Sequence, residues 1–263
     1  MTLIMGVVNT SPDSFSGDGL NDPHAAVQHG LDLVAQGADL LDVGAESTRP
    51  GFTPIAPSEQ IARLRPVVEG LADAGVPVSV DTTSAMVAYA GLAAGATMIN
   101  DVSGGLGDEA MLGMVAACDV DFICGWWPGF PSHELSAEVG RPMWRRTVDE
   151  LLWRRDACMD AGVPSHRIVL DPGLGFGKSA GDNWQILAHI DAITDLGHRV
   201  LIGASRKRFL DAHKEHRDVA TAAVTAWCAG HGVWAVRVHD VEKNRQTVAV
   251  MDNVTDIQAK ADR

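Results

Sequence analysis

The chain has 263 residues, 46% of them hydrophobic and 21% charged, which is an ordinary globular composition with enough length for one large core. Its formal net charge of −13 argues against nucleic acid or an anionic membrane as a partner, because both attract basic surfaces. The four cysteines form no C-x-x-C pair and no apolar run reaches about 18 residues, so we expect a cytoplasmic protein without zinc, disulfides or membrane spans.

A short apolar run recurs eight times along the chain. Six of the runs follow a glycine, which is typical of the position just after a helix, where glycine adopts the left-handed conformation without strain. The runs predict buried parallel strands at residues 3–8, 39–43, 76–81, 96–100, 120–124, 167–171, 200–205 and 233–239.

Helical patterns separate these strands. Apolar residues recur every three or four positions over residues 25–36, 58–74 and 144–161. After residue 241 a final helix is predicted, with one apolar face made of Val248, Met251, Val254 and Ile257. The alternation predicts an α/β fold, a single-domain (β/α)₈ TIM barrel over residues 1–263. The alternative is an open doubly wound sheet, but no Rossmann fingerprint follows the first strand.

Polar residues close most of the predicted strands, and catalytic residues of such barrels lie at the C-terminal ends of the strands. Each residue alone has a structural alternative, since it could cap a helix or shape a turn. Together they predict one active-site mouth, lined by Asn9, Asp42, Asp81, Asn100, Asp101, Asp171, Ser205, Lys207, Arg237 and His239.

The cationic members of this set indicate an anionic ligand. Lys207 follows the seventh strand, and Arg237 and His239 lie on the eighth, where barrels commonly bind phosphate. Lys207 could instead be a solvated lysine between Arg206 and Arg208. Arg237 lies inside an apolar strand and therefore needs a partner.

Asp81, Asn100 and Asp171, on the third, fourth and sixth strands, suit hydrogen bonds to a flat, nitrogen-rich ring. The glycine-rich segment 172–178 is not a Walker A loop, because Pro172 stands where that motif needs glycine. Its glycines predict a close approach of the backbone to a ligand. The loops at 9–19 and 46–51 leave the same face and are expected to be functional, and the irregular segment 125–142 is a candidate lid or specificity loop.

Seven sequence blocks, taken in order, resemble the dihydropteroate synthase family of the folate pathway. They are residues 5–15 (MGVVNTSPDSF), 37–51 (GADLLDVGAESTRPG), 80–82 (VDT), 99–101 (IND), 170–176 (LDPGLGF), 203–207 (GASRK) and 236–241 (VRVHDV). The resemblance implies a pterin-binding barrel that joins 6-hydroxymethyl-7,8-dihydropterin diphosphate to 4-aminobenzoate, forming 7,8-dihydropteroate and releasing pyrophosphate. It also implies a homodimer that assembles through barrel helices.

The resemblance further implies roles for individual residues. The pterin would be held by Asp81, Asn100, Asp171 and Lys207. The diphosphate would be held by Arg237 and His239, with Thr48 approaching from its loop and Asn9 helping to hold Mg²⁺. Lys207, Arg237 and His239 would thus be the catalytic residues, with the cations stabilising charge on the departing pyrophosphate. The 4-aminobenzoate pocket, where sulfonamide mimics would bind, would be built by Phe15, Pro50 and Phe176.

Three departures from the family pattern leave alternatives open. They are Ser11 with the reordered Gly17-Asp18-Gly19, the strand end Cys124-Gly125-Trp126-Trp127 in place of a Met-His pair near the pterin, and Asp211 where a glycine is usual. One alternative is a catalytically reduced homologue that keeps the pterin pocket. The other is a pterin-dependent methyltransferase domain, which would have no use for the Ser205–Lys207 motif or the diphosphate cations.

Overall fold

Eight parallel strands form a closed barrel in the computed structural model, which describes residues 1–10, 22–46, 55–128 and 140–261. The strands are β1 (Leu3–Asn9), β2 (Leu40–Gly44), β3 (Val78–Asp81), β4 (Met98–Asp101), β5 (Asp121–Gly125), β6 (Ile168–Asp171), β7 (Arg199–Ile202) and β8 (Ala235–Val238). They pair in sequence order, and β8 closes onto β1 with Arg237 beside Met5. The predicted TIM barrel is confirmed.

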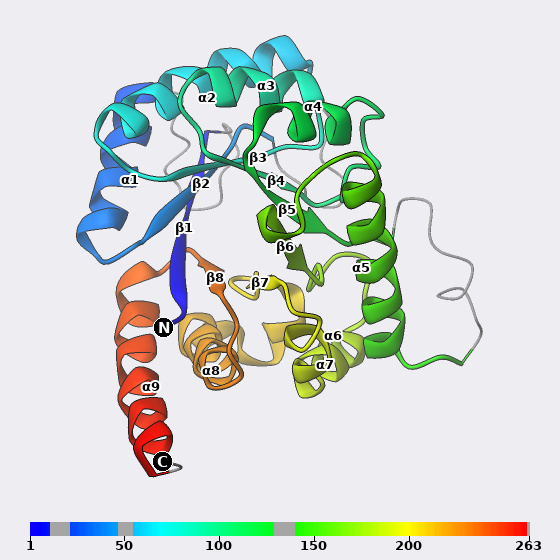
Figure 1. The fold of residues 1–263 in the computed structure, drawn as a ribbon. Coiled ribbons are helices and arrows are strands. Elements are labelled where there is room, and N and C mark those ends of the chain that lie inside the picture. Colours follow the sequence, from blue (N-terminus) through cyan, green and yellow to red (C-terminus); the bar gives the residue numbers. More distant parts are fainter. Residues whose placement is uncertain (11–21, 47–54, 129–139, 262–263) are drawn as a thin grey trace.

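Helices ring the strands on the outside (Figure 1). Within the described residues they are α1 (Pro23–Ala35), α2 (Pro57–Asp73), α3 (Ala85–Ala93), α4 (Met111–Cys118), α5 (Met143–Asp160), α6 (Ala180–Ala188), α7 (Asp191–Thr194), α8 (Arg217–Gly230) and α9 (Val241–Ala261), with short 3₁₀ segments η2 (Ser165–Arg167) and η3 (Arg208–His216). Local chemistry sets their ends: Asp22 caps α1 by accepting from the His24 amide at 3.0 Å. Gly37, with φ of +106°, turns the chain from α1 towards β2.

The apolar face predicted for the final helix is only partly buried. Val248 of α9 is fully buried, but Val254 and Ile257 are 44% and 67% exposed. The C-terminal end of α9 lies away from the strands (Figure 1), so its last apolar residues have no barrel surface to cover. The final helix is formed as predicted, but the barrel covers only the first half of its apolar face.

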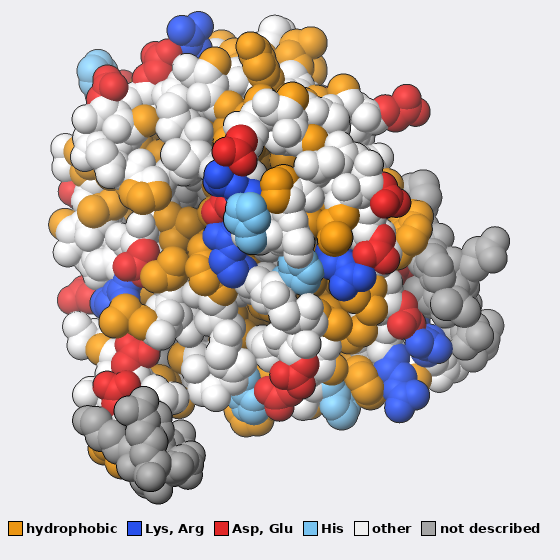
Figure 2. Space-filling view, viewed as in Figure 1, with side chains coloured by type: hydrophobic (Ala, Val, Ile, Leu, Met, Phe, Trp, Pro, Cys, Tyr) orange, Lys and Arg blue, Asp and Glu red, His pale blue; other side chains and the backbone are white. Residues whose placement is uncertain are grey.

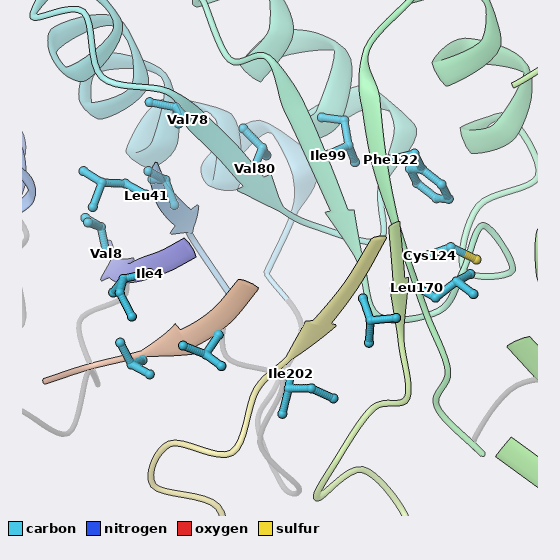
Figure 3. Packing of buried hydrophobic residues seen from close by; sticks show 14 of the residues in the cluster. Ile4, Val8, Leu41, Val78, Val80, Ile99, Phe122, Cys124, Leu170 and Ile202 are labelled. Carbon is cyan, nitrogen blue, oxygen red and sulfur yellow. The ribbon is translucent and has the colours of Figure 1, made fainter. Parts of the chain in front are cut away.

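Side chains alternate along the strands between two apolar layers. The inner layer fills the barrel and consists of Met5, Leu40, Met98, Ile123, Val169, Leu201 and Ala235. The outer layer packs against the helices, and Figure 3 shows its members Leu41, Phe122 and Ile202 around the outside of the ring of strands. Side chains along a strand alternate with a period of two residues, so the residues two positions after the inner layer also face inward. They lie at the C-terminal ends of the strands.

The N-terminal ends of the strands carry ion pairs. Asp121 at the start of β5 accepts a hydrogen bond from Arg199 of β7 at 2.7 Å and lies 3.7 Å from Arg167. Figure 2 shows acidic, basic and histidine side chains together near the centre of the face drawn. No helix in the described ranges is long and apolar enough to cross a membrane. The ion pairs of Asp121 link β5 to β7 and to η2 at the N-terminal end of the barrel. The active site is therefore expected at the C-terminal end, as in other barrels of this fold.

Candidate active site

Inward-facing polar side chains meet at the C-terminal end of the barrel. Two positions beyond the inner apolar layer lie Asp42, Asn100, Asp171 and Arg237, and Asn9 and Asp81 are the last residues of β1 and β3. Asp42, Asn100 and Asp171 are buried, while the other three are half-buried and open towards the mouth. The alternation of the strands therefore places these six of the ten polar residues expected from sequence in one mouth. Asp101 was wrongly expected there: it follows Asn100, so the two-residue period turns it outward, where its carboxylate accepts from the Ser103 and Gly105 amides at 2.8 and 3.0 Å.

Asp42 links the residues expected at the pterin to those expected at the diphosphate. Its Oδ2 accepts from Arg237 Nε at 2.5 Å and from Asn100 Nδ2 at 3.0 Å. Arg237 Nη2 in turn donates to Asp81 Oδ2 at 2.8 Å. The partner that Arg237 needed is thus a pair of carboxylates. Sequence reasoning placed Asp42 at the mouth but assigned it no partner, although a carboxylate inside an apolar strand needs a partner as much as Arg237 does.

Two acceptor atoms on the floor of the mouth remain open to a ligand. Oδ1 of Asp42 and Oδ1 of Asn100 are buried and have no hydrogen-bond partner within the described residues. A buried acceptor that stays unpaired costs free energy, so a group with N–H donors binds favourably here. The floor therefore suits the edge of a nitrogen-rich ring.

The carboxyl groups of the mouth are tuned by burial. Burial and the nearby Asp42 raise the pKa of Asp81 to about 7, against the lowering effect of Arg237 and Lys207. Burial also raises the pKa of Asp171, although the Gly173 amide hydrogen bond and Lys207 lower it. Burial acts to lower the pKa of Arg237, but Asp42 and Asp81 more than offset this and raise it. The mouth thus holds a permanent guanidinium together with two carboxyl groups, Asp81 and Asp171, whose pKa is raised.

The remaining predicted cations lie around the same mouth. Lys207 Nζ lies 3.7 Å from the centroid of the Phe176 ring. His239 Nδ1 lies 3.0 Å from Ser205 Oγ, and the His239 amide donates to the same oxygen at 3.3 Å. Strand β7 ends at Ile202, three residues before the predicted boundary, so Ser205 and Lys207 belong to the loop that follows it.

Strand β5 contributes no side chain to the mouth. Cys124 faces outward, where it is fully buried in the outer layer with its Sγ 3.8 Å from Cys158 Sγ of α5. The inward position is Gly125, where an added Cβ would lie 2.6 Å from Val102 Cα. Among the four residues that replace the usual Met-His pair, Trp126 is fully buried and Trp127 half-buried. The strand end that departs from the family pattern thus offers no side chain in place of the Met-His pair, because the two-residue period turns Cys124 towards α5 and Gly125 has none.

Lys178 is the last residue of the glycine-rich segment 172–178, and its ammonium group points back into the protein. It donates to the Gly173 carbonyl at 2.9 Å and lies 4.1 Å from the centroid of the Trp126 ring. Burial lowers the pKa of Lys178 to about 7. The sequence feature that could have pointed to this role is the run of glycines before Lys178, because glycines let the backbone turn several carbonyls towards one side chain.

Three predicted residues, Phe15, Thr48 and Pro50, lie outside the described residues, as does most of the candidate lid at 125–142. For a metal, the described residues contain no cluster of three or more His, Cys, Asp or Glu side chains. Mg²⁺ often takes one or two protein oxygens and fills its shell with water and substrate phosphates. The amide oxygen of Asn9, on the strand that pairs with β8, fits such a site.

Comparison with known proteins places this geometry in context. Residues 5–239 match the family model described as "Pterin binding enzyme". The dihydropteroate synthase of Mycobacterium leprae is 42% identical over 265 aligned positions, which cover 94% of this chain and 92% of that protein.

Solved structures agree with this match. The dihydropteroate synthase of Xanthomonas albilineans with 4-aminobenzoic acid superposes with a TM-score of 0.88 at 39% identity, covering 97% of this chain and 93% of that one. The same enzyme in complex with 7,8-dihydropteroate gives a TM-score of 0.84 at 34% identity, with the same coverage of 97% and 93%. The chain is therefore similar along its whole length to enzymes of one activity.

Proposed function

The chain belongs to the dihydropteroate synthases, within the pterin-binding enzyme family, and from this premise we propose how its own residues divide the work. It is a transferase that condenses 6-hydroxymethyl-7,8-dihydropterin diphosphate with 4-aminobenzoate, giving 7,8-dihydropteroate and pyrophosphate for folate synthesis. The observation that carries this function is the 42% identity to a dihydropteroate synthase over 94% of this chain.

The pterin ring binds on the floor of the mouth. Asp81, Asn100 and Asp171 present oxygens towards one space, and the unpaired Oδ1 of Asn100 offers an acceptor there. An ionised carboxylate facing adjacent ring N–H groups makes a paired, directional contact. Lys207 lies close enough to lower the pKa of both Asp81 and Asp171, which supports its place at the edge of the ring.

The diphosphate binds beside β8. Arg237 and His239 are its protein partners among the described residues, and the family resemblance adds Thr48, which lies outside them. As the bond between the pterin methylene and the diphosphate oxygen breaks, charge grows on the departing group, and a fixed guanidinium stabilises that charge without reorganisation. Asn9 would help to hold Mg²⁺, which would supply further charge neutralisation at the diphosphate.

The amine adds in a step that depends on position. An arylamine is largely unprotonated at neutral pH, so no strong general base is required and we assign none. Phe176, under the Lys207 ammonium, forms one wall of the 4-aminobenzoate pocket. The family resemblance assigns Phe15 and Pro50, which lie outside the described residues, to the same pocket. Holding the amine nitrogen close to the pterin methylene carbon makes the reaction of two bound substrates effectively unimolecular, which lowers the entropic part of the barrier.

The decisive experiment follows both products of the complete reaction. Purified protein is incubated with the pterin diphosphate, Mg²⁺ and 4-aminobenzoate, and pyrophosphate and dihydropteroate are measured. Release that depends on the amine supports the synthase. Binding of the pterin by folded protein without amine-dependent release would instead identify a catalytically reduced homologue, and a methyltransferase domain would not turn over the diphosphate.

We also propose that the protein is a homodimer. An apolar groove of about 620 Å³ runs between α6, η3 and α8 and is lined by Trp184, Val219 and Trp227. These three side chains are 43%, 64% and 46% exposed, which is unusual for large apolar residues and typical of an interaction surface.

The four free cysteines fit a reducing compartment, which supports a cytoplasmic location.

A further inference from the structure

The loop after β6 closes around the ammonium group of Lys178. The group donates to three backbone carbonyls, those of Gly173 at 2.9 Å, Trp126 at 3.3 Å and Phe176 at 3.4 Å. A lysine ammonium has three N–H donors, so each carbonyl takes one. No step of the proposed reaction uses Lys178, and its charge is directed at the protein backbone.

The contact with Trp126 ties two strand ends together. The Lys178 ammonium lies 4.1 Å from the centroid of the buried Trp126 ring, within the range of a cation–π interaction. The two backbones touch at the same place, since a Cβ added to Gly173 would lie 2.0 Å from the Trp126 oxygen. Lys178 thus bridges the residue that follows β5 and the loop that follows β6.

The loop held in this way connects the two proposed substrate pockets. At its start, the Gly173 amide donates to Asp171 Oδ1 at 2.8 Å, which orients the carboxylate at the pterin. In its middle, the Gly175 amide donates to Asn183 Oδ1 at 2.7 Å. Near its end lies Phe176, the wall of the amine pocket. Two of the three carbonyls bound by Lys178 belong to this loop, one beside each pocket.

We propose that Lys178 is a positioning residue, which holds the Asp171–Phe176 loop against Trp126 and thereby sets the pterin pocket and the 4-aminobenzoate pocket relative to each other. The inference rests on the roles proposed above for Asp171 and Phe176. It assigns a function to the buried Trp126, one of the residues that replace the usual Met-His pair of the family. In this chain the end of β5 acts on the pterin through the neighbouring loop and the Lys178 bridge.

The test compares Lys178→Met with Lys178→Arg and with a control, Lys243→Met, at a lysine that is 56% exposed and pairs with Asp218 and Asp240. Calorimetry measures binding of 6-hydroxymethylpterin, of 4-aminobenzoate in its presence, and of pyrophosphate with Mg²⁺. We expect Lys178→Met to weaken both organic ligands by about tenfold and to leave pyrophosphate affinity unchanged. Lys178→Arg, which keeps charge and donors, should recover part of the loss, and Lys243→Met should change nothing.

Other outcomes overturn the inference. Unchanged affinity for both organic ligands in a folded Lys178→Met protein shows that the loop does not need the bridge. A loss confined to pyrophosphate makes Lys178 a phosphate ligand. If Lys178→Met does not fold, Lys178→Gln, which keeps an N–H₂ donor, replaces it with the same expected split. These experiments measure ligand affinity and not turnover, so they test the role of Lys178 even if the wild-type protein releases no pyrophosphate. That absence of release would contradict the proposed function alone.

Discussion

Arg237 Nη2 donates a hydrogen bond to Asp81 Oδ2 at 2.8 Å, so the cation assigned to the diphosphate contacts the carboxylate assigned to the pterin. Asp42 holds the other side of the guanidinium through Nε. The two halves of the substrate therefore meet a single connected group of charges. A ligand that takes up Asp81 changes the surroundings of Arg237, which couples recognition of the ring to recognition of the leaving group.

Replacing Arg237 with alanine should separate the two halves of the substrate. A hydrogen bond to a charged group contributes about 1.5–3 kcal/mol, so we expect diphosphate affinity to fall by roughly tenfold to a hundredfold. Binding of the unphosphorylated hydroxymethyl pterin should weaken less, because its direct partners remain. Calorimetry with both ligands measures the difference, and equal losses would contradict the role assigned to Arg237.

Asp81 predicts opposite effects of pH on stability and on pterin binding. Its pKa, raised by burial and Asp42, is about 7 in the folded protein against 3.8 as the ordinary value. The folded state therefore holds this proton more tightly than the unfolded state, and the stability that Asp81 contributes at low pH is lost as pH rises from about 4 to 7. Ionised Asp81 is the better partner for ring N–H groups, so pterin affinity should rise through about pH 7.

The matched variant for this prediction is Asp81→Asn, which keeps the shape and cannot ionise. Urea unfolding of both proteins across the same pH range should show wild type losing stability relative to the variant as pH increases. Calorimetry with hydroxymethylpterin should show a pH dependence near neutrality in wild type that is absent in the variant. A pH response shared by both proteins would assign it to another group.

The proposed dimer can be tested on one exposed residue. Val219 of α8 lies in the apolar groove, and a charge placed there must be desolvated if a second subunit covers it. We expect Val219→Glu to be monomeric by sedimentation at concentrations where wild type is dimeric. Val250→Glu is the control, because Val250 of α9 is 62% exposed and does not line the groove. A wild-type monomer would show that the homodimer proposal is wrong.

The barrel and the contents of its mouth were predictable because both follow from short-range patterns. Glycines marked the helix ends, and the polar residue closing each apolar run marked the C-terminal end of a strand. Asp81, Asn100, Asp171 and Arg237 were found in this way without knowledge of any contact. The closed topology followed from counting eight alternating units.

What could not be predicted depends on orientation and on contacts across the barrel. Cys124 and Gly125 are neighbours in sequence, and only the register of β5 shows that Gly125 faces inward and Cys124 outward. The partners of Arg237 are Asp42 and Asp81, 195 and 156 positions away, and no local pattern connects them. The Lys178 bridge likewise joins residues whose backbones meet only after β5 and β6 pair.

Gly173 tests whether the close packing of the β5 and β6 ends is needed for folding. Its φ is +64°, and an added Cβ would overlap the Trp126 oxygen at 2.0 Å. The positive φ alone costs an L residue about 1–2 kcal/mol, and forced repacking adds about 1–3 kcal/mol. Gly197, with φ of +77° and nothing within 4 Å of the added Cβ, isolates the first cost. We therefore expect urea unfolding to show Gly173→Ala less stable than Gly197→Ala by about 1–3 kcal/mol, with a lower pterin affinity in the Gly173 variant only. Equal stability of the two variants would mean that the loop can retreat from Trp126, and that the separation between Asp171 and Phe176 is set elsewhere.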